Sequence, residues 1–394
     1  MAVRNEIMNR LDKRFGEMVE LRRHLHMYPE KSFEEEKTAL FIKQYYEGKD
    51  VEILELDGAF GFGVLIHQDD AYKTIGLRAD FDALEISEKT DLEFKSKHDG
   101  LMHACGHDMH TAYMMVLADV LIEFRNELKV NILVIHQHAE EIPPGGAIDF
   151  IEQGIVDDVD VFVGGHVVPF MKPGTFAFRK GVLFSGSDVL ELEFKGKNSH
   201  ASMPEFGRDA ILAASDFVVQ ANLVLAKHIA PSESGIINVG SFEAPGPTNV
   251  VNDRARLSIS IRYLDLKTRE TIKSSLKRLV DSIALFHEVE VDFDYREGYP
   301  PVINDEKLTD GISDYFESHD FDYIDKIIEL EKPVMASEDF GRFSLEKPSF
   351  FAHFSASNGT DEVNHSPYFE IDEKGMLHMA KFVADIILYL GENT

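Results

Sequence analysis

The chain reads His103-Ala-Cys-Gly-His-Asp-Met-His110 at the mouth of a predicted helix, and this segment decides how the rest is interpreted. It holds three histidines, one cysteine and one aspartate. Such side chains are the usual ligands of divalent transition metals, and ligands one residue apart can reach neighbouring positions around one ion or an ion pair. The segment therefore predicts a metal centre. Two alternatives stay open: surface histidines beside a buried cysteine, and a catalytic Cys105 with His107 as its base.

Further ligand-type residues follow predicted strands or stand in loops. Open α/β sheets place their sites at the carboxyl ends of strands, so we expect these residues to converge. Glu140 and Glu141 repel each other unless a cation holds them, which predicts one metal ligand and one acceptor of a proton from water. Asp80 and Asp82 are expected to orient ligands. The segments are Leu77–Leu84, His136–Glu141, Val163–His166 and Asn364–Pro367.

The spacing of apolar residues predicts an α/β domain with helices on both faces of a sheet. Apolar residues from Ile7 to Leu25 recur at helical spacing, which predicts one amphipathic helix over the first thirty residues, ending near Pro29. The predicted strands that follow are Val51–Leu56, Phe62–Ile66, Thr74–Ala79, Asn131–Ile135 and Val159–Val163, and the predicted helices are Thr111–Phe124 and Gly146–Gln153.

A change of pattern near Val182 marks a second unit. At 394 residues the chain exceeds the roughly 250 to 300 residues at which single domains stop growing, so two domains are expected. Alternating strands and two helices between residues 183 and 297 predict an inserted α+β domain. The catalytic domain then comprises residues 1–182 and 298–394. Its last predicted helices cover Leu308–Ser318 and begin at Lys374.

Composition indicates a folded protein and narrows its partners. Hydrophobic residues make up 44% and charged residues 28% of the chain, which is ordinary for globular proteins. The formal net charge of −30 argues against nucleic acid and anionic membranes, which need a basic surface. Met1–Arg10 lacks an apolar segment after a basic one, and no apolar run approaches the ~18 residues of a membrane helix. We therefore expect a cytoplasmic protein, whose single Cys105 cannot form an internal disulfide.

Together these segments resemble the M20 metallopeptidase family, in particular its amidohydrolase branch of aminoacylases, hippurate hydrolases and auxin-conjugate hydrolases. The resemblance runs nearly end to end, and the His-Ala-Cys-Gly-His-Asp block is its most specific part. The other markers are Arg23–His26, Pro29-Glu30, Phe33–Glu35, Arg78–Leu84, Ala139–Glu141, His166, Ser199–Ala201, Ser337–Phe340 and His365.

The resemblance implies a catalytic domain with a mixed central sheet flanked by helices, as in zinc peptidases. It also implies that the inserted domain is a lid through which such enzymes commonly form homodimers or larger homo-oligomers. Two divalent metal ions per subunit are implied, zinc or manganese, with cobalt or nickel as further choices. Their implied ligands are Cys105, His107, Glu141, His166 and His365.

The resemblance further implies roles in catalysis. Glu140 is the implied general base, and His200 matches a lid histidine that helps to stabilise the oxyanion, often from the neighbouring subunit. Asp80, at its strand end, is predicted as a further catalytic residue. Asn249 and Arg262 fall where lid residues meet a substrate carboxylate. The expected function is metal-dependent hydrolysis of the amide bond of N-acyl amino acids or small peptides by an activated water.

Several segments depart from the pattern of the branch. Gln137–Ala139 replaces Gln-Pro-Ala, Ile142–Gly146 replaces a run of glycines, Ser202–Glu205 lacks a second histidine, and Ser260–Arg262 replaces a Gly-Thr-hydrophobic-Arg strand. No predicted ligand is lost, so these departures concern the substrate. An aminopeptidase or carboxypeptidase acting on short peptides is the alternative function. A catalytically silent metal-binding protein and a cysteine hydrolase are further alternatives.

Overall fold

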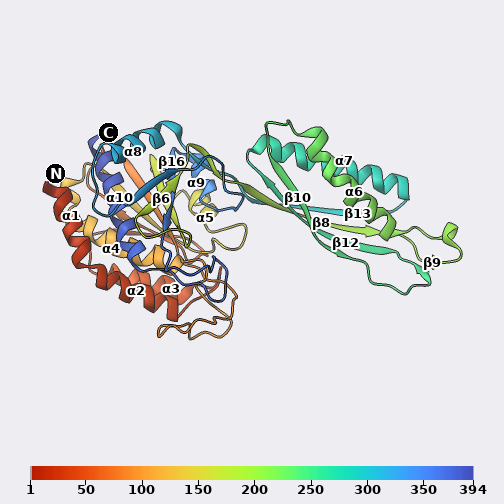
Figure 1. Ribbon diagram of the computed structural model, residues 1–394, viewed down its shortest axis with the longest axis horizontal. Helices are drawn as coiled ribbons and strands as arrows, with labels where there is room; N and C mark the ends of the chain where they lie inside the picture. Colours follow the sequence, from red (N-terminus) through yellow and green to blue (C-terminus); the bar gives the residue numbers. More distant parts are fainter. Residues whose placement is uncertain (1, 394) are drawn as a thin grey trace. The chain divides into compact units, whose positions relative to one another are not determined.

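The computed structural model describes residues 2–393, and contacts within the chain divide it into two compact units (Figure 1). Unit 1 comprises the chain up to Leu183, Ile303–Pro333, and the chain from Arg342 onward. Unit 2 comprises Phe184–Val302 and Val334–Gly341. The units thus interleave twice along the sequence.

The segment Val334–Gly341 was predicted within the catalytic domain but lies in unit 2. Hydrogen bonds from Ser185 and from Arg262 help to attach it. The Ser185 amide donates to the Val334 carbonyl over 3.0 Å, and Ser185 Oγ donates to the Ala336 carbonyl over 3.0 Å. The apolar spacing of this segment did not predict that it belongs to unit 2.

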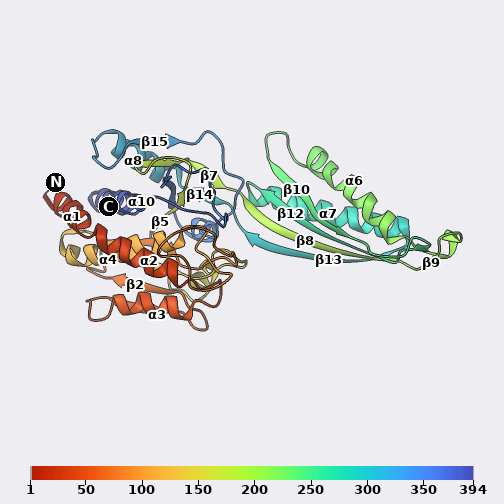
Figure 2. The same cartoon turned by 60° about the horizontal axis from the view of Figure 1, so that its bottom comes forward.

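An eight-stranded mixed sheet forms the centre of unit 1, in the order β1-β2-β4-β3-β5-β16-β6-β15. Figure 2 labels its strands β2, β5 and β15. The central strands β4, β3, β5 and β16 run parallel to their neighbours in this series. Every residue of β4 and β16 is buried, which explains their continuous apolar runs. The strands are β1 (Glu52–Glu55), β2 (Phe62–Ile66), β3 (Thr74–Asp80), β4 (Asn131–Gln137), β5 (Val161–Val168), β6 (Thr175–Phe178), β15 (Lys326–Glu329) and β16 (Ser349–Ser355).

Helices flank this sheet, and the first and last of them lie side by side (Figure 1). The forked contact between Arg4 and Asp385, at 2.6 and 2.8 Å, ties α1 to α10. The helices are α1 (Ala2–Lys13), α2 (Phe15–Met27), α3 (Glu36–Tyr45), α4 (His107–Glu123), α5 (Ala147–Glu152), α8 (Glu306–Glu317), α9 (Gly341–Glu346) and α10 (Lys374–Glu392), with a 3-10 turn at Arg125–Glu127.

The single helix predicted over the first thirty residues is wrong, because the chain forms α1 and α2 with a break at Arg14. Arg14 leaves helical geometry at φ −102° and ψ 8°. Its guanidinium group lies 2.8 Å from Glu17 and 2.7 Å from Asp119. The apolar spacing continues across the break, so periodicity alone could not reveal it.

Unit 2 contains a four-stranded antiparallel sheet, in the order β10-β12-β8-β13, with α6 and α7 packed against it. The predicted alternation is confirmed: Leu190, Leu192 and Phe194 of β8 are buried beside alternate residues of β12. The elements are β8 (Gly186–Lys195), α6 (Ala210–His228), β10 (Gly235–Glu243), β12 (Arg254–Tyr263), α7 (Leu266–His287) and β13 (Glu290–Tyr299), with short strands β9 (Ser199–His200) and β11 (Val250–Val251) and a 3-10 turn at Pro204–Phe206. The short strands β7 (Gly181–Phe184) and β14 (Val302–Asn304) stand where the chain passes from one unit to the other.

Among the described residues, α6 is the one helix long and apolar enough to cross a membrane by length and composition alone. The expectation concerned uninterrupted apolar runs and missed this helix, because Ser215, Asp216 and Gln220 interrupt its apolar residues. A packed helix of a soluble protein passes the same test, and α6 packs Ala213, Ala214 and Phe217 into the core of unit 2. Its opposite side is exposed: Val219 is 73% and Leu212 57% accessible.

Candidate metal centre

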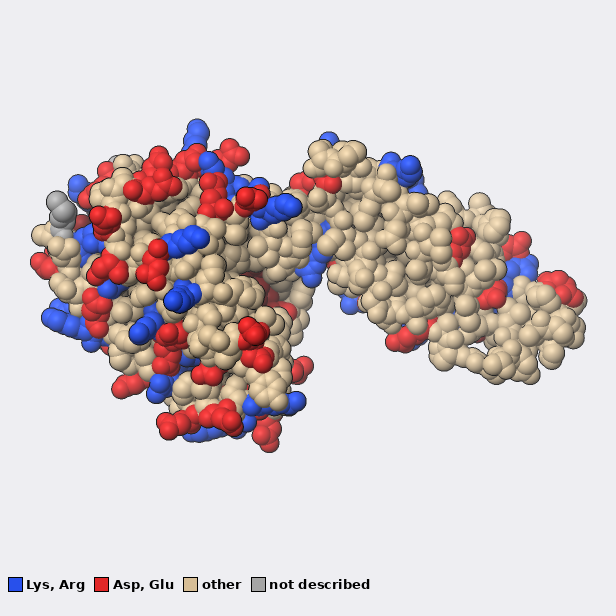
Figure 3. All heavy atoms as spheres, viewed as in Figure 1, with Lys and Arg blue, Asp and Glu red and all other residues tan. Residues whose placement is uncertain are grey.

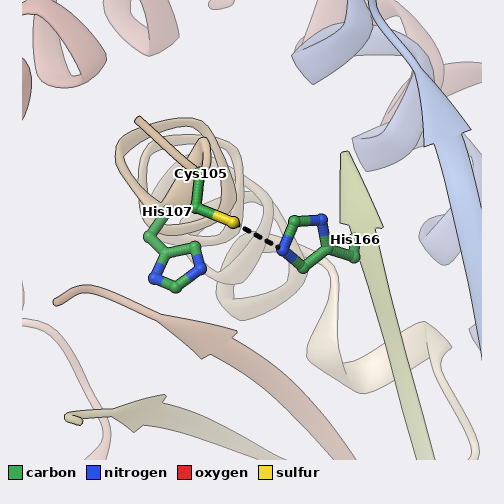
Figure 4. Close-up of side chains that lie close together, drawn as sticks. All are labelled: Cys105, His107 and His166. Atoms are coloured by element: carbon green, nitrogen blue, oxygen red, sulfur yellow. Dashed lines mark hydrogen bonds between the residues drawn. The ribbon is translucent and has the colours of Figure 1, made fainter. Parts of the chain in front are cut away.

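Three of the predicted ligands meet where α4 begins beside β5. Figure 4 shows Cys105, His107 and His166 with their side chains turned toward one another. Cys105 Sγ lies 3.4 Å from His166 Nε2. Gly106, at φ 92°, makes this approach possible, because a Cβ atom there would stand 2.3 Å from Val167 Cγ1.

Glu141 and His365 complete the group of five. His365 Nε2 lies 3.3 Å and His107 Nε2 3.8 Å from Glu141 Oε1. Candidate ligand atoms of Cys105, His107 and His166, and likewise of Cys105, Glu141 and His365, all lie within 4.8 Å of one another. The structure therefore gathers all five predicted ligands around Cys105.

The hydrogen bonds of His107 and His166 involve Nδ1 of each ring, and Nε2 faces the other candidate ligands. His107 Nδ1 lies 3.1 Å from both the carbonyl oxygen and Oδ1 of Asp82, and His166 Nδ1 lies 2.8 Å from the Val167 carbonyl. Since these oxygens accept, Nδ1 is the donor in both rings, and Nε2 is the nitrogen that lies toward the other candidate ligands. Among the described side chains, His107 Nε2 and Glu141 Oε1 are buried without a hydrogen-bond partner. Buried polar atoms are normally paired, so these two fit a bound cation.

The electrostatics of the site also fit cations. Burial by itself lowers the pKa of His107, but the carboxylates of Asp80, Asp82 and Glu141 outweigh it and raise that pKa to about 10. Burial, followed by the charges of Glu141 and Glu140, raises the pKa of the Cys105 thiol well above its ordinary value. A catalytic cysteine needs the opposite shift. The site therefore does not support the cysteine hydrolase and favours a thiolate formed only when metal binds.

Asp80 lies beneath the centre and is held on both oxygens. Its Oδ2 lies 2.6 Å from Arg78 Nη1, and its Oδ1 lies 2.6 Å from His110 Nδ1. His110 Nε2 in turn accepts from the Val167 amide over 3.0 Å, so both nitrogens of this histidine are engaged. These contacts agree with the expectation that Asp80 orients ligands, and its catalytic role stays a prediction.

Glu140 is 6% exposed and directly precedes the ligand Glu141. Its Oε2 lies 4.0 Å from His107 Nε2, within a group of ligand atoms that also includes Glu141. A carboxylate at the edge of a metal centre, buried from bulk water, is placed to exchange a proton with a water there. The geometry thus brings both adjacent glutamates close to His107 Nε2, Glu141 at 3.8 Å and Glu140 at 4.0 Å.

The predicted lid residues all lie in unit 2. His200 and Asn249 are exposed on facing chain segments: the Ala201 amide donates to the Asn249 carbonyl over 2.9 Å. His200 Nδ1 lies 2.7 Å from Ser202 Oγ. Arg262 is partly buried on β12 and donates to Ser337 Oγ over 2.8 Å. Ser337 belongs to the returning segment of unit 2, which the sequence did not assign there.

Two residues of the centre received no role from the sequence. Asn364 Nδ2 donates to the Cys105 carbonyl over 3.2 Å and lies 3.7 Å from Cys105 Sγ. Glu35 accepts a hydrogen bond from the Ala139 amide. Glu35 stands in a segment that carries the family resemblance and Asn364 directly before the marker His365, but their partners lie 104 and 259 positions away. No periodicity or spacing signals contacts of that range.

Five converging thiol, imidazole and carboxylate ligands beside a further buried carboxylate define a metal-dependent hydrolase. The comparisons with known proteins agree. The model of peptidase family M20/M25/M40 matches residues 76–389. "Putative amidohydrolase YhaA" of Bacillus subtilis strain 168 is 38% identical over 386 residues, covering 97% of each chain. N-acetyl-L-cysteine deacetylase of the same strain is 34% identical, covering 93% of this chain and 86% of its own.

A solved structure adds to this. The YXEP protein of Bacillus subtilis, described as a dinuclear metal-binding peptidase of the M20 family, superimposes with a TM-score of 0.82 at 28% identity, covering 97% of this chain and all of its own. The chain belongs to peptidase family M20/M25/M40. It is a metal-dependent hydrolase of carbon–nitrogen amide bonds that binds two divalent metal ions.

Proposed function

We propose that this enzyme removes the acyl group from N-acyl amino acids, with Glu140 as the general base. One observation carries the proposal: a buried Glu140 stands directly beside a ring of five ligand-type side chains. The deacetylase activity in the name of one relative supports a small N-acyl substrate. Hydrolysis of short peptides by an aminopeptidase or carboxypeptidase is the alternative.

Cys105, His107, Glu141, His166 and His365 are the proposed ligands. When bound, the two cations supply Lewis acidity toward water and the amide carbonyl. Cysteine and histidine ligands favour zinc, and the carboxylate also admits manganese, cobalt or nickel. Asp82 orients the imidazole of His107 through Nδ1, and Asp80 Oδ2 lies 3.6 Å from the Nε2 atom that would bind the metal.

Glu140 accepts a proton from the attacking water and delivers it to the departing nitrogen. His200 donates to the developing oxyanion, a contribution typically worth ~3 kcal/mol for one donor. Arg262 and Asn249 bind the substrate carboxylate, and the planar guanidinium group suits a bidentate contact. These three residues give unit 2 the task of recognising substrate.

We also propose that the protein is a homodimer, or a larger homo-oligomer, assembled through unit 2. β10 is an edge strand of its sheet, and α6 exposes large apolar side chains. Few charged side chains lie over the face of unit 2 seen in Figure 3, whereas acidic and basic side chains are mixed over unit 1. An edge strand beside an apolar helix is a favourable surface for a second copy. Light scattering at micromolar concentration tests this, and a monomer contradicts it.

A cytoplasmic location completes the proposal. A lone cysteine that serves as a metal ligand suits a reducing compartment. Cell fractionation followed by immunoblotting checks this, and recovery from the medium or the membrane pellet contradicts it.

Hydrolysis of a defined panel of amides tests the proposed activity. The purified protein is assayed against N-acetyl and N-benzoyl amino acids and dipeptides, before and after chelation and with Zn²⁺ or Mn²⁺ restored. Metal-dependent release of amino acids from the N-acyl compounds is the expected result. Cleavage of the dipeptides alone establishes the peptidase instead, and silence toward every amide with metal bound contradicts both.

A further inference from the structure

The main-chain amides on either side of Glu140 are each bound by a buried carboxyl group. The Ala139 amide donates to Glu35 Oε1 over 2.8 Å, and the Glu141 amide donates to Asp82 Oδ2 over 3.0 Å. Both acceptors are distant in sequence, so the tertiary fold brings them to this turn. The pair holds the backbone of the proposed general base at two points.

Asp82 has a second task, because its Oδ1 also contacts the ligand His107. Glu35 has none of this kind. It stands at the start of α3 but its side chain does not cap that helix. It is fully buried, and its Oε2 has no hydrogen-bond partner among the described residues. A buried carboxyl group is costly; the main chain of Phe33 and of Glu35 itself also stabilises it, and the Ala139 amide is its long-range hydrogen bond.

The turn that Glu35 holds has an unusual backbone. Ala139 is fully buried and adopts φ 52°, a conformation that residues with a Cβ atom rarely adopt. Its carbonyl accepts from the Gly146 amide over 3.1 Å. The peptide groups on both sides of the Ala139 Cα are therefore fixed by hydrogen bonds, and the following residue, Glu140, is aimed by them.

The electrostatic environment of Glu35 fits a neutral acceptor. Burial, and after it the negative charge of Asp82, raise the pKa of Glu35 to about 8. An uncharged carbonyl oxygen at this place is sufficient to receive the Ala139 amide. The amide side chain of glutamine offers such an oxygen with the same length and no charge.

We propose that Glu35 is a positioning residue for the hydrolytic reaction: through the Ala139 amide, it fixes the turn that directs Glu140 toward the metal centre. This rests on the proposed role of Glu140 as general base. A misplacement of about 1 Å in a reacting group can cost about 100-fold in rate, which sets the size of the effect to expect.

A matched pair of variants, Glu35→Gln and Glu35→Met, tests the proposal in the metal-loaded enzyme. Both side chains are neutral and similar in length, but methionine lacks the oxygen acceptor. We expect Glu35→Gln to keep kcat within about threefold of the natural enzyme and Glu35→Met to lose about 100-fold. KM and the metal content by elemental analysis should stay nearly unchanged in both variants, which a general loss of structure does not predict.

Equal kcat values for the two variants overturn the proposal, whether both are active or both impaired. If Glu35→Met does not fold, hydrogen exchange in Glu35→Asp replaces it: faster exchange of the Ala139 amide with unchanged exchange in α3 supports the proposal, and unchanged exchange overturns it. Glu140→Gln is assayed in parallel. Full activity of Glu140→Gln refutes the proposed general base itself, whereas an inactive Glu140→Gln with an active Glu35→Met refutes only the positioning role.

Discussion

The metal centre of unit 1 and the predicted substrate-binding residues of unit 2 are built differently. In the centre, Cys105 and His107 are buried, and the inner nitrogen of His107 faces the other ligands because Asp82 holds the outer one. In unit 2, His200 and Asn249 are exposed. The His200 side chain makes hydrogen-bond contacts with Ser202, two positions further along the chain.

This difference separates preorganised residues from residues that act only when a ligand or a second subunit arrives. Buried side chains with fixed hydrogen bonds have already lost their conformational freedom during folding. Exposed ones lose it when they bind. Variants in unit 1 should therefore change proton transfer or metal affinity, and variants in unit 2 should change oxyanion stabilisation, substrate recognition or assembly.

Glu140→Gln should produce the largest effect in this comparison. Removing a general base typically costs about 10²- to 10⁴-fold in rate, so kcat should fall by that amount while both metals stay bound. Steady-state kinetics and elemental analysis measure this, with the exposed Glu152→Gln as control. An unchanged kcat contradicts the assignment and makes the catalytically silent protein or another base the better explanation.

His200→Ala tests the exposed side of the comparison. Loss of one oxyanion donor should reduce kcat by about 10²- to 10³-fold. The folding of unit 2 should not change, because His200 is exposed. His228→Ala, at the exposed end of α6, is the matched control. Equal activity of the two variants excludes His200 from the reaction.

Asp82→Ala should lower the affinity for metal without removing a ligand. Loss of the carboxylate that orients a ligand histidine typically costs about 10- to 100-fold in metal affinity. Competition with a chelator of known affinity measures the change, and Asp70→Ala, whose side chain is 99% exposed, serves as control. Unchanged affinity means that the bond to His107 Nδ1 does not matter for binding.

Glu35, a buried residue of unit 1, should make the free energy of unfolding depend on pH. Its pKa is about 8 in the folded protein, against an unfolded value near ~4.3. Between these values the folded state keeps a proton that the unfolded state has released. The free energy of unfolding therefore falls as pH rises from about 5 to 8. Residue 35 cannot titrate in Glu35→Gln. In urea unfolding, the free energy of unfolding of this variant should therefore rise relative to that of the natural protein between about pH 5 and 8. A difference that does not change with pH contradicts the raised pKa of Glu35.

Charges on the exposed face of α6 should give the smallest effect on folding. Leu212→Lys with Val219→Lys should leave the free energy of unfolding of the chain within about 0.5 kcal/mol of a monomeric reference, since both side chains are exposed. The same pair should convert the dimer to a monomer in sedimentation velocity. Leu285→Lys, 82% exposed on α7, is the control. A dimer that survives the α6 charges places the interface elsewhere.

The sequence alone determined most of the strands of unit 1 and the types of ligand. β2 begins and ends at the predicted residues, and β3 and β4 begin where predicted, because period and apolar runs are local properties. The five ligands were identified because Cys, His and Glu clustered at strand ends have few other uses, and the family resemblance named the set.

Only the tertiary structure decided how distant segments combine. It placed β16, from near the end of the chain, between β5 and β6, and gave Val334–Gly341 to unit 2. It also brought Glu35 to the Ala139 amide across 104 positions. Local propensity reaches only a few residues along the chain, whereas these pairings depend on the burial and hydrogen bonding of the folded whole, which no single segment of sequence encodes.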